Sequence, residues 1–255
     1  MTQKKAAGER IMKDDFISKM TESAAGLGLS LTSGQTGQLW SYYEMLVEKN
    51  KVMNLTAITE EDEVITKHFT DSLSIVRCLD PGFFAGGPSV IDVGTGAGFP
   101  GLVLKIAFPE AKVTLFDSQK KRLLFLEEVI GALGLKGAET VHGRAEDYGH
   151  DPAYREKYDL AVSRAVANMS VLTEYCLPFV KKGGYFAAYK TADCGEEIAA
   201  AEGAVQKLGG VIKDRVSFRL PGTEIGRCLI LVQHEKATPG KYPRKAGQPS
   251  KDPLK

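Results

Sequence analysis

A glycine-rich segment carries the clearest chemical signal in this 255-residue sequence. A short apolar run, residues 90–93, leads directly into residues 94–101, GTGAGFPG. Glycines permit positive φ angles and close backbone approach, and a following helix N-terminus offers unpaired N–H groups, so a turn of this kind between a strand and a helix binds nucleotides. We therefore expect ligand contacts at Gly94, Gly96 and Gly98.

An acidic residue just before this segment bears on which nucleotide is bound. Gly96, Gly98 and Gly101 have the spacing of the dinucleotide-binding fingerprint, G-x-G-x-x-G. The carboxylate of Asp92 would repel a pyrophosphate in the turn but would attract the ammonium group of a methionine moiety. The sequence therefore favours S-adenosylmethionine, which has no phosphate. A dinucleotide, or a tight connection that binds nothing, are the alternatives.

Acidic residues also follow the next two predicted strands. Asp117 lies about 20 residues after Gly98, the spacing at which an acid reaches ribose hydroxyls in this architecture. It could also cap the helix that starts at Ser118. After the third strand, the backbone N–H of Ala145 and the carboxylate of Glu146 could bind the edge of adenine, although a solvated turn explains this pair equally simply.

The charge balance excludes a protein that is basic throughout. The sequence contains 33 Lys and Arg against 32 Asp and Glu, a net charge of +1. Only residues 236–255 are strongly basic, with six Lys and Arg against one Asp. Arg244 and Lys245 in this tail are candidates for binding RNA phosphates, whereas the plainer interpretation is a solvated tail.

The catalytic candidates do not include a nucleophile paired with a general base, since no Ser/His/Asp or Cys/His arrangement stands out in the sequence. Arg164 and Lys190 end the fourth and fifth predicted strands, so both lie at one rim of a parallel sheet. Arg164 could bind substrate, the donor's carboxylate or a structural acid, and Lys190 an RNA backbone or solvent. His68 and Asp71 lie three residues apart on one face of a predicted helix, where they could hold a base or serve only the structure.

Further features exclude several classes of protein. No apolar run approaches the ~20 residues that span a membrane, and no apolar stretch follows the basic N-terminus as in a secretory signal. We therefore expect a soluble cytoplasmic protein. The four cysteines are scattered without C-x-x-C spacing, which indicates reduced thiols and no metal site.

The pattern of apolar residues predicts the elements that position these candidates. Residues 11–79 have helical periodicity, and a Gly- and Pro-rich break follows at 80–88. Strand and helix patterns then alternate, which indicates parallel strands with crossover helices, and residues 211–233 form an antiparallel hairpin. The predicted fold class is α/β: a Rossmann-like class I methyltransferase domain, a mostly parallel sheet with a terminal hairpin, beneath an N-terminal helical layer. The expected units are an extension that is possibly helical (1–34), the helical layer (35–88), the S-adenosylmethionine-binding domain (89–235) and the basic tail (236–255).

Several motifs together resemble one family of enzymes. These are residues 92–101, Ser163-Arg164-Ala165, Asn54-Leu55-Thr56, His68-x-x-Asp71-Ser72-Leu73 and the tail segment 242–247. From about residue 35 to 253 the sequence is similar to the bacterial 16S rRNA guanine-N7 methyltransferases, the RsmG or GidB family; residues 1 to about 34 depart from that pattern. The resemblance implies cofactor contacts at eight positions: Gly94, Phe99, Asp117, Ser118, Gln119, Ala145, Glu146 and Arg164. For Phe99 and Gln119 the resemblance is the only reason to expect a cofactor contact.

The resemblance also implies a reaction and a substrate. A cytoplasmic enzyme of this family methylates N7 of one guanine in the 530 loop of 16S rRNA (position 527 in the usual rRNA numbering), so the expected partner is 16S rRNA, the 30S subunit or its assembly intermediate. Guanine N7 is an exposed lone pair that attacks without losing a proton, so catalysis should consist of alignment. We expect a monomer. The alternatives are a small-molecule methyltransferase, for which the tail is irrelevant, and an RNA-binding module without catalysis.

Overall fold

A seven-stranded sheet forms the centre of the computed structural model, which describes residues 2–164 and 167–255, with side chains from residue 10 onward. The strand order is β3-β2-β1-β4-β5-β7-β6. Strands β1 to β5 run parallel, whereas β7 is antiparallel to both of its neighbours, β5 and β6. This arrangement confirms the predicted fold class. The strands are β1 (Ser89–Val93), β2 (Lys112–Asp117), β3 (Ala138–His142), β4 (Tyr158–Arg164), β5 (Val180–Thr191), β6 (Gly210–Arg219) and β7 (Gly226–His234).

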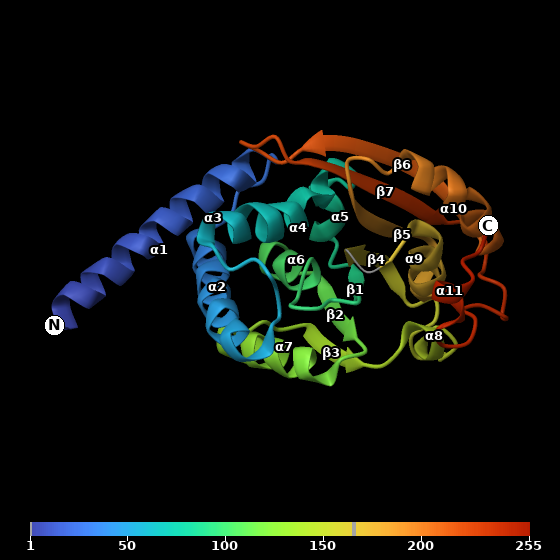
Figure 1. The fold of residues 1–255 in the computed structure, drawn as a ribbon, viewed down its shortest axis with the longest axis horizontal. Helices are drawn as coiled ribbons and strands as arrows, with labels where there is room; N and C mark the ends of the chain where they lie inside the picture. Colours follow the sequence, from blue (N-terminus) through green and yellow to red (C-terminus); the bar gives the residue numbers. More distant parts are fainter. Residues whose placement is uncertain (1, 165–166) are drawn as a thin grey trace.

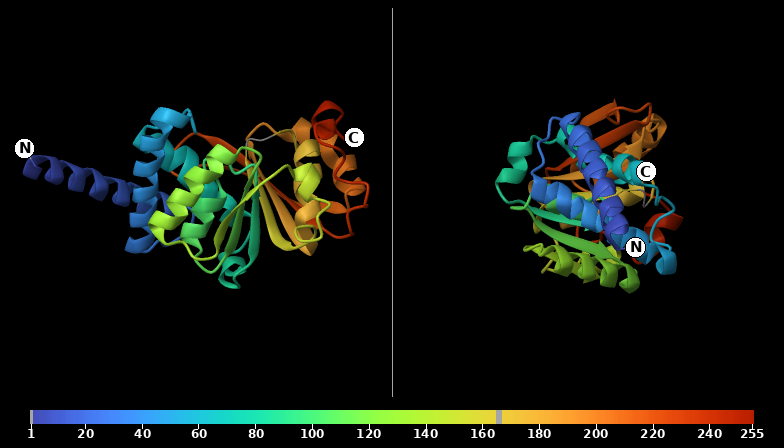
Figure 2. Two further views of the ribbon diagram at one scale, coloured as in Figure 1. Left: turned by 90° about the horizontal axis from the view of Figure 1, so that it is seen from below. Right: turned by 90° about the vertical axis from the view of Figure 1, so that its left-hand side faces the viewer.

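Helices cover both faces of the sheet (Figures 1 and 2). On one face lie α6 (Gly101–Ala107) and α7 (Lys120–Leu133), with α2 (Ser33–Met53) packed against both. The other face carries α9 (Met169–Cys176), η3 (Leu177–Phe179) and α10 (Gly195–Lys207). Each face of the sheet has its own hydrophobic core, and the side chains of β7 alternate between them. Leu229 and Leu231 face the core under α6 and α7, and Ile230 faces the core under α9 and α10.

The N-terminal helices belong to the same core as the sheet. Helix α1 (Thr2–Ala25) begins well away from the body of the molecule (Figures 1 and 2), but Phe16 and Met20 in its second half are fully buried. Thr32 caps α2 through a capping box with Gln35. The expected boundary at residue 34 is therefore wrong, since it would cut this cap and separate residues of one core.

Several short helices complete the fold, and one of them fills a segment that the sequence patterns did not identify as helical. The Gly- and Pro-rich break contains α5 (Pro81–Ala85), because Asp80 caps it and a proline suits the first turn. The remaining short elements connect or follow the longer ones: α3 (Glu61–Val64), the π-helical η1 (Ile65–Thr70), α4 (Asp71–Leu73), η2 (Ser74–Arg77), α8 (Ala145–Tyr148) and α11 (Gln248–Lys251).

The C-terminal tail is folded against the protein and is not a solvated tail. Arg155 donates hydrogen bonds to the carbonyls of Thr238 (2.6 Å) and Tyr242 (2.9 Å). Arg244 grips the carboxylate of Glu174 on α9, with Nε 2.9 Å from Oε1 and Nη2 2.7 Å from Oε2. The Glu174 side chain is completely buried. The guanidinium that we expected on an RNA phosphate is thus bound by a protein carboxylate, whereas Lys245 is exposed.

Replacing Arg244 should destabilise the fold. In Arg244→Ala the Glu174 carboxylate stays buried without its partner, and we expect the free energy of unfolding in urea to fall by about 3–5 kcal/mol. The matched control is Lys245→Ala, an exposed neighbour that should change it by less than about 0.5 kcal/mol. Equal stability of the two variants would contradict this role. Deletion of residues 236–255 is unsuitable as a test of RNA binding for the same reason.

Candidate cofactor and substrate site

The loop between β1 and α6 uses nearly all of its backbone donors within the protein. Of residues 94–101, one is a proline, and six others donate their N–H groups to protein acceptors. A pyrophosphate bound at a glycine turn needs such N–H groups unpaired. The loop therefore does not offer the usual phosphate-binding donors. The donated bonds are Gly94 and Thr95 to the Phe116 carbonyl, Gly96 to Asp117 Oδ2, Gly98 and Phe99 to the Thr95 carbonyl, and Gly101 to Asp92 Oδ2.

Asp92 fastens this loop from behind. Its Oδ2 accepts hydrogen bonds from the Thr95 hydroxyl (2.7 Å) and the Gly101 N–H (2.8 Å). The side chain is fully buried, and burial raises the pKa of its carboxyl to about 6. Among the described residues, its Oδ1 has no hydrogen-bond partner. The carboxylate of Asp92 thus lies inside the protein and shapes the loop, and its expected contact with a methionine ammonium stays a prediction.

Gly98 has a packing role, and it lines none of the three cavities described below. Its φ is +105°, and a Cβ atom there would lie 2.5 Å from the Tyr42 hydroxyl and 2.9 Å from Leu126. Tyr42, on α2, donates its hydroxyl hydrogen to the carbonyl of Ala97. Sequence reasoning missed Tyr42, since nothing distinguishes it from other aromatic residues of a buried helix face.

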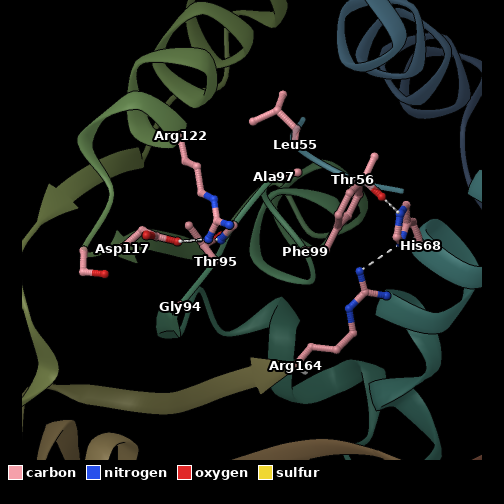
Figure 3. Close-up of a pocket in the computed structure, with 12 residues that line it drawn as sticks. Leu55, Thr56, His68, Gly94, Thr95, Ala97, Phe99, Asp117, Arg122 and Arg164 are labelled. Carbon is pink, nitrogen blue, oxygen red and sulfur yellow. Dashed lines mark hydrogen bonds and ion pairs between the residues drawn. The ribbon is translucent and has the colours of Figure 1, made fainter. Parts of the chain in front are cut away.

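Two neighbouring cavities lie where β1, β2 and β3 end. The first, of about 440 Å³, is shown in Figure 3, and the second encloses about 340 Å³. They share Gly94, Asp117 and Ser118. Most of the predicted cofactor contacts line one or both of them: Gly94, Gly96, Phe99, Asp117, Ser118 and Arg164 the first, and Gly94, Asp117, Ser118, Ala145 and Glu146 the second. Gln119 lies outside both and is exposed, and only its N–H reaches Asp117 Oδ1 (2.8 Å).

Two carboxylates, three guanidinium groups and bare backbone line these cavities. Asp117 accepts the Gly96 N–H at 2.9 Å, and Arg122 approaches it to 3.6 Å. A Cβ atom at Gly96 would meet only one atom, the Gly94 carbonyl oxygen at 4.0 Å, so the glycine leaves open space over the loop. In the second cavity, Glu146 accepts the N–H of Gly247 (3.0 Å), so the tail forms part of the wall. The open space over Gly96 and the carboxylates of Asp117 and Glu146 fit the ribose and base of a nucleoside.

Arg164 joins the two helical candidates at the edge of the first cavity. Its Nη1 donates to Asp71 Oδ2 (3.0 Å) and its Nη2 to His68 Nδ1 (3.1 Å), and Figure 3 shows Arg164 pointing toward His68. Asp71 is buried, and its other oxygen accepts from Nε of Arg227 on β7 (3.0 Å). Sequence reasoning missed Arg227, which belongs to no motif. Ala165 lies outside the described residues.

His68 is held as a neutral ring. A guanidinium can only donate, so Nδ1 accepts from Arg164 and the ring proton lies on Nε2, 2.9 Å from the Thr56 hydroxyl. Burial and the charge of Arg164 lower the pKa of His68 to about 3. The ring stacks on Phe99, with centroids 4.4 Å apart. At neutral pH His68 therefore positions its neighbours and does not exchange protons.

A third cavity, of about 420 Å³, adjoins the first and contains Lys190. His68 and Arg164 line both. The Lys190 ammonium is not solvated, because it donates to Glu197 Oε1 (2.6 Å) and to the Ala167 carbonyl (2.7 Å). Within residues 2–164 and 167–255, no group of three or more His, Cys, Asp or Glu could hold a metal ion, and no helix is long and apolar enough to cross a membrane.

The two loop glycines should respond differently to a methyl group. Gly98→Ala places Cβ against Tyr42, so we expect a loss of about 2–5 kcal/mol in the free energy of unfolding, from overpacking and a strained φ. Gly96→Ala adds only the strain of its φ of +60°, about 1–2 kcal/mol, and its methyl group projects into the cavity. The affinity of the Gly96→Ala variant for S-adenosylhomocysteine, measured by calorimetry, should fall at least tenfold. Equal losses of stability in the two variants would contradict this assignment.

The ring of His68 should not titrate between pH 5 and 8. Because its folded pKa of about 3 lies below the unfolded value of 6.5, its contribution to stability is complete above pH 6.5 and is lost as the pH falls toward 3. NMR titration of the ring signals of the four histidines measures this, with His68→Asn as the assignment control. A midpoint near pH 6.5 for His68 would disagree with a buried neutral ring.

Comparisons with known proteins agree with the site. The family model described as GidB, rRNA small subunit methyltransferase G, matches residues 35–223. Proteins named ribosomal RNA small subunit methyltransferase G include one from Alkaliphilus oremlandii, 51% identical over 236 residues (92% of this chain, 98% of that protein). Another, from Lachnoclostridium phytofermentans, is 48% identical over 243 residues (95% and 98%). The family model begins at residue 35, so residues 1–34 lie outside it, as expected.

Solved structures share the fold at low sequence identity. A mutant of MtNAS matches with a TM-score of 0.52 and 13% identity, over 80% of this chain and 75% of that one. A branched-chain polyamine synthase mutein from Thermus thermophilus matches with a TM-score of 0.51 and 14% identity, over 67% and 57%. The sequence relatives are far more informative, and they confirm the resemblance read from the motifs: the chain belongs to the rRNA small subunit methyltransferase G family.

Proposed function

We propose that this protein transfers the methyl group of S-adenosylmethionine to N7 of a guanine in the 530 loop of 16S rRNA, at position 527 in the usual rRNA numbering. Membership of the family makes it an rRNA methyltransferase; the cofactor, the atom and the nucleotide are the proposal. We further propose that it acts as a monomer in the cytoplasm, on the 30S subunit or its assembly intermediate.

The observation that favours S-adenosylmethionine over a dinucleotide is that most N–H groups of the loop at 94–101 are already hydrogen-bonded within the protein. A dinucleotide would need these donors for its pyrophosphate and would meet the carboxylate of Asp117 beside it. S-adenosylmethionine has no phosphate, and its ribose hydroxyls can donate to a carboxylate at the end of β2. When bound, it supplies an electrophilic methyl group. Gly94 and Asp117 would hold its nucleoside, and Ala145 and Glu146 would bind its adenine.

The residues at the rim are suited to alignment and not to proton transfer. Guanine N7 attacks through a lone pair, so no base is needed, and the buried His68 ring is neutral and already hydrogen-bonded on both nitrogens. Arg164 has two N–H groups, Nε–H and one on Nη2, that are not donated to any described residue. One of them can bind guanine O6 while N7 stays accessible. Holding the base in this way supports an in-line attack.

Methyl transfer tests the proposal directly. The protein is incubated with labelled S-adenosylmethionine and 30S particles from a strain that lacks this methylation, and the modified nucleotide is mapped. We expect label at N7 of the proposed guanine. Transfer to another rRNA atom would refute the proposed target. Donor binding without transfer to any RNA would favour an RNA-binding module without catalysis. Label on a small molecule only would favour a small-molecule methyltransferase.

Arg164→Ala should reduce turnover while the protein stays folded. The variant loses a hydrogen-bond donor at the reacting base, and we expect kcat for methylation of 30S particles to fall about 100-fold. Asp71 keeps its bond to Arg227, so the free energy of unfolding should drop by no more than about 1–3 kcal/mol. Lys181→Ala, an exposed change on β5 away from the cavities, is the control. An unfolded Arg164→Ala variant would show that the arginine is mainly structural.

A further inference from the structure

Glu197 presents a carboxylate to the third cavity, next to the one that we assign to the methyl donor. The residue lies in the first turn of α10, and its Oε1 is fixed by the Lys190 ammonium (2.6 Å) and the Met169 N–H (2.5 Å). No described residue donates to its Oε2. The side chain is 32% exposed, so the carboxylate is anchored on one side and accessible on the other.

The cavity around this carboxylate has the features of a base-binding site. Its volume of about 420 Å³ falls in the range of small-molecule pockets. Ile58 and Tyr189 contribute apolar surface, on which an unstacked base can pack. His68 and Arg164 form the boundary with the first cavity, whereas Glu197 lines only the third. A base bound here would have one edge near the methyl donor and another edge near Glu197.

The chemistry of guanine matches this arrangement. Its N7 and O6 acceptors lie on one edge, which would face Arg164 and the first cavity. The adjoining Watson–Crick edge presents the N1–H and N2–H donors, and the two lone pairs of an open carboxylate oxygen such as Oε2 can accept both. Adenine presents an acceptor at N1, which a carboxylate repels. A carboxylate at this place therefore selects guanine among purines.

We propose that Glu197 determines the base specificity of the enzyme by accepting hydrogen bonds from N1–H and N2–H of the target guanine. This inference rests on the proposed function, because it assumes guanine as the substrate. Lys190 is then a positioning residue: it binds Oε1 and leaves Oε2 directed to the base. An amide in place of the carboxylate would keep an acceptor for Lys190 and Met169 but would offer N–H donors to the base.

The experiment compares Glu197→Gln with Glu196→Gln, an exposed neighbour in the same helical turn. Each is assayed on 30S particles reconstituted with 16S rRNA that carries either guanine or adenine at the target position. We expect the unaltered protein and Glu196→Gln to prefer guanine strongly. In Glu197→Gln, kcat/KM for guanine should fall about 100-fold or more, and the guanine-to-adenine ratio should fall at least 100-fold. Affinity for S-adenosylhomocysteine should change less than twofold.

The possible outcomes separate the two proposals. An unchanged guanine-to-adenine ratio in Glu197→Gln, even with slower turnover, would overturn the role of Glu197 while leaving the proposed function intact. If the unaltered protein transfers no methyl group to the guanine particle, the proposed function fails and this inference fails with it. If Glu197→Gln does not fold, Glu197→Asp replaces it: the retained carboxylate should preserve the preference for guanine at reduced kcat/KM, and loss of that preference would count against the proposal.

Discussion

A buried carboxylate joins the N-terminal helices to the rim of the sheet. Asp71, on α4, lies between the guanidinium groups of Arg164 from β4 and Arg227 from β7, and only 4% of the residue is exposed. A buried charge is strongly unfavourable unless it is paired and hydrogen-bonded. The need to neutralise Asp71 therefore holds α4, β4 and β7 together, although they are far apart in the sequence. It also holds Arg164 at the boundary between the first and third cavities.

The same principle operates in the loop after β1, with a different result. Asp92 has no cationic partner within hydrogen-bonding distance among the described residues, and it binds the loop through Thr95 and Gly101. Burial raises the pKa of its carboxyl group, and these two hydrogen bonds oppose that rise. Six backbone N–H groups of the loop are bonded within the protein, so they are not free for the phosphate that its glycine spacing suggests. The glycine spacing and the bonding of the loop thus indicate different ligands, and the bonding is the more specific guide.

Local patterns were sufficient to predict much of the fold. The apolar run at residues 90–93 agrees with β1, and the antiparallel pairing of β6 with β7 follows from the short loop between them. The rim was also predictable, because parallel strands place Arg164 and Lys190 at one edge. The packing of the tail was not, since Arg244 meets a glutamate 70 residues away. The packing of Tyr42 against Gly98 and the proposed role of Glu197 could not be predicted either, because both depend on contacts between distant segments.

The bond between Glu146 and the Gly247 N–H has a consequence for how the enzyme becomes active during its synthesis. Translation proceeds from the N-terminus, so Gly247 is made after every strand of the sheet and after all the other residues that line the two nucleoside cavities. A nascent chain with a complete sheet still lacks one wall of its second cavity.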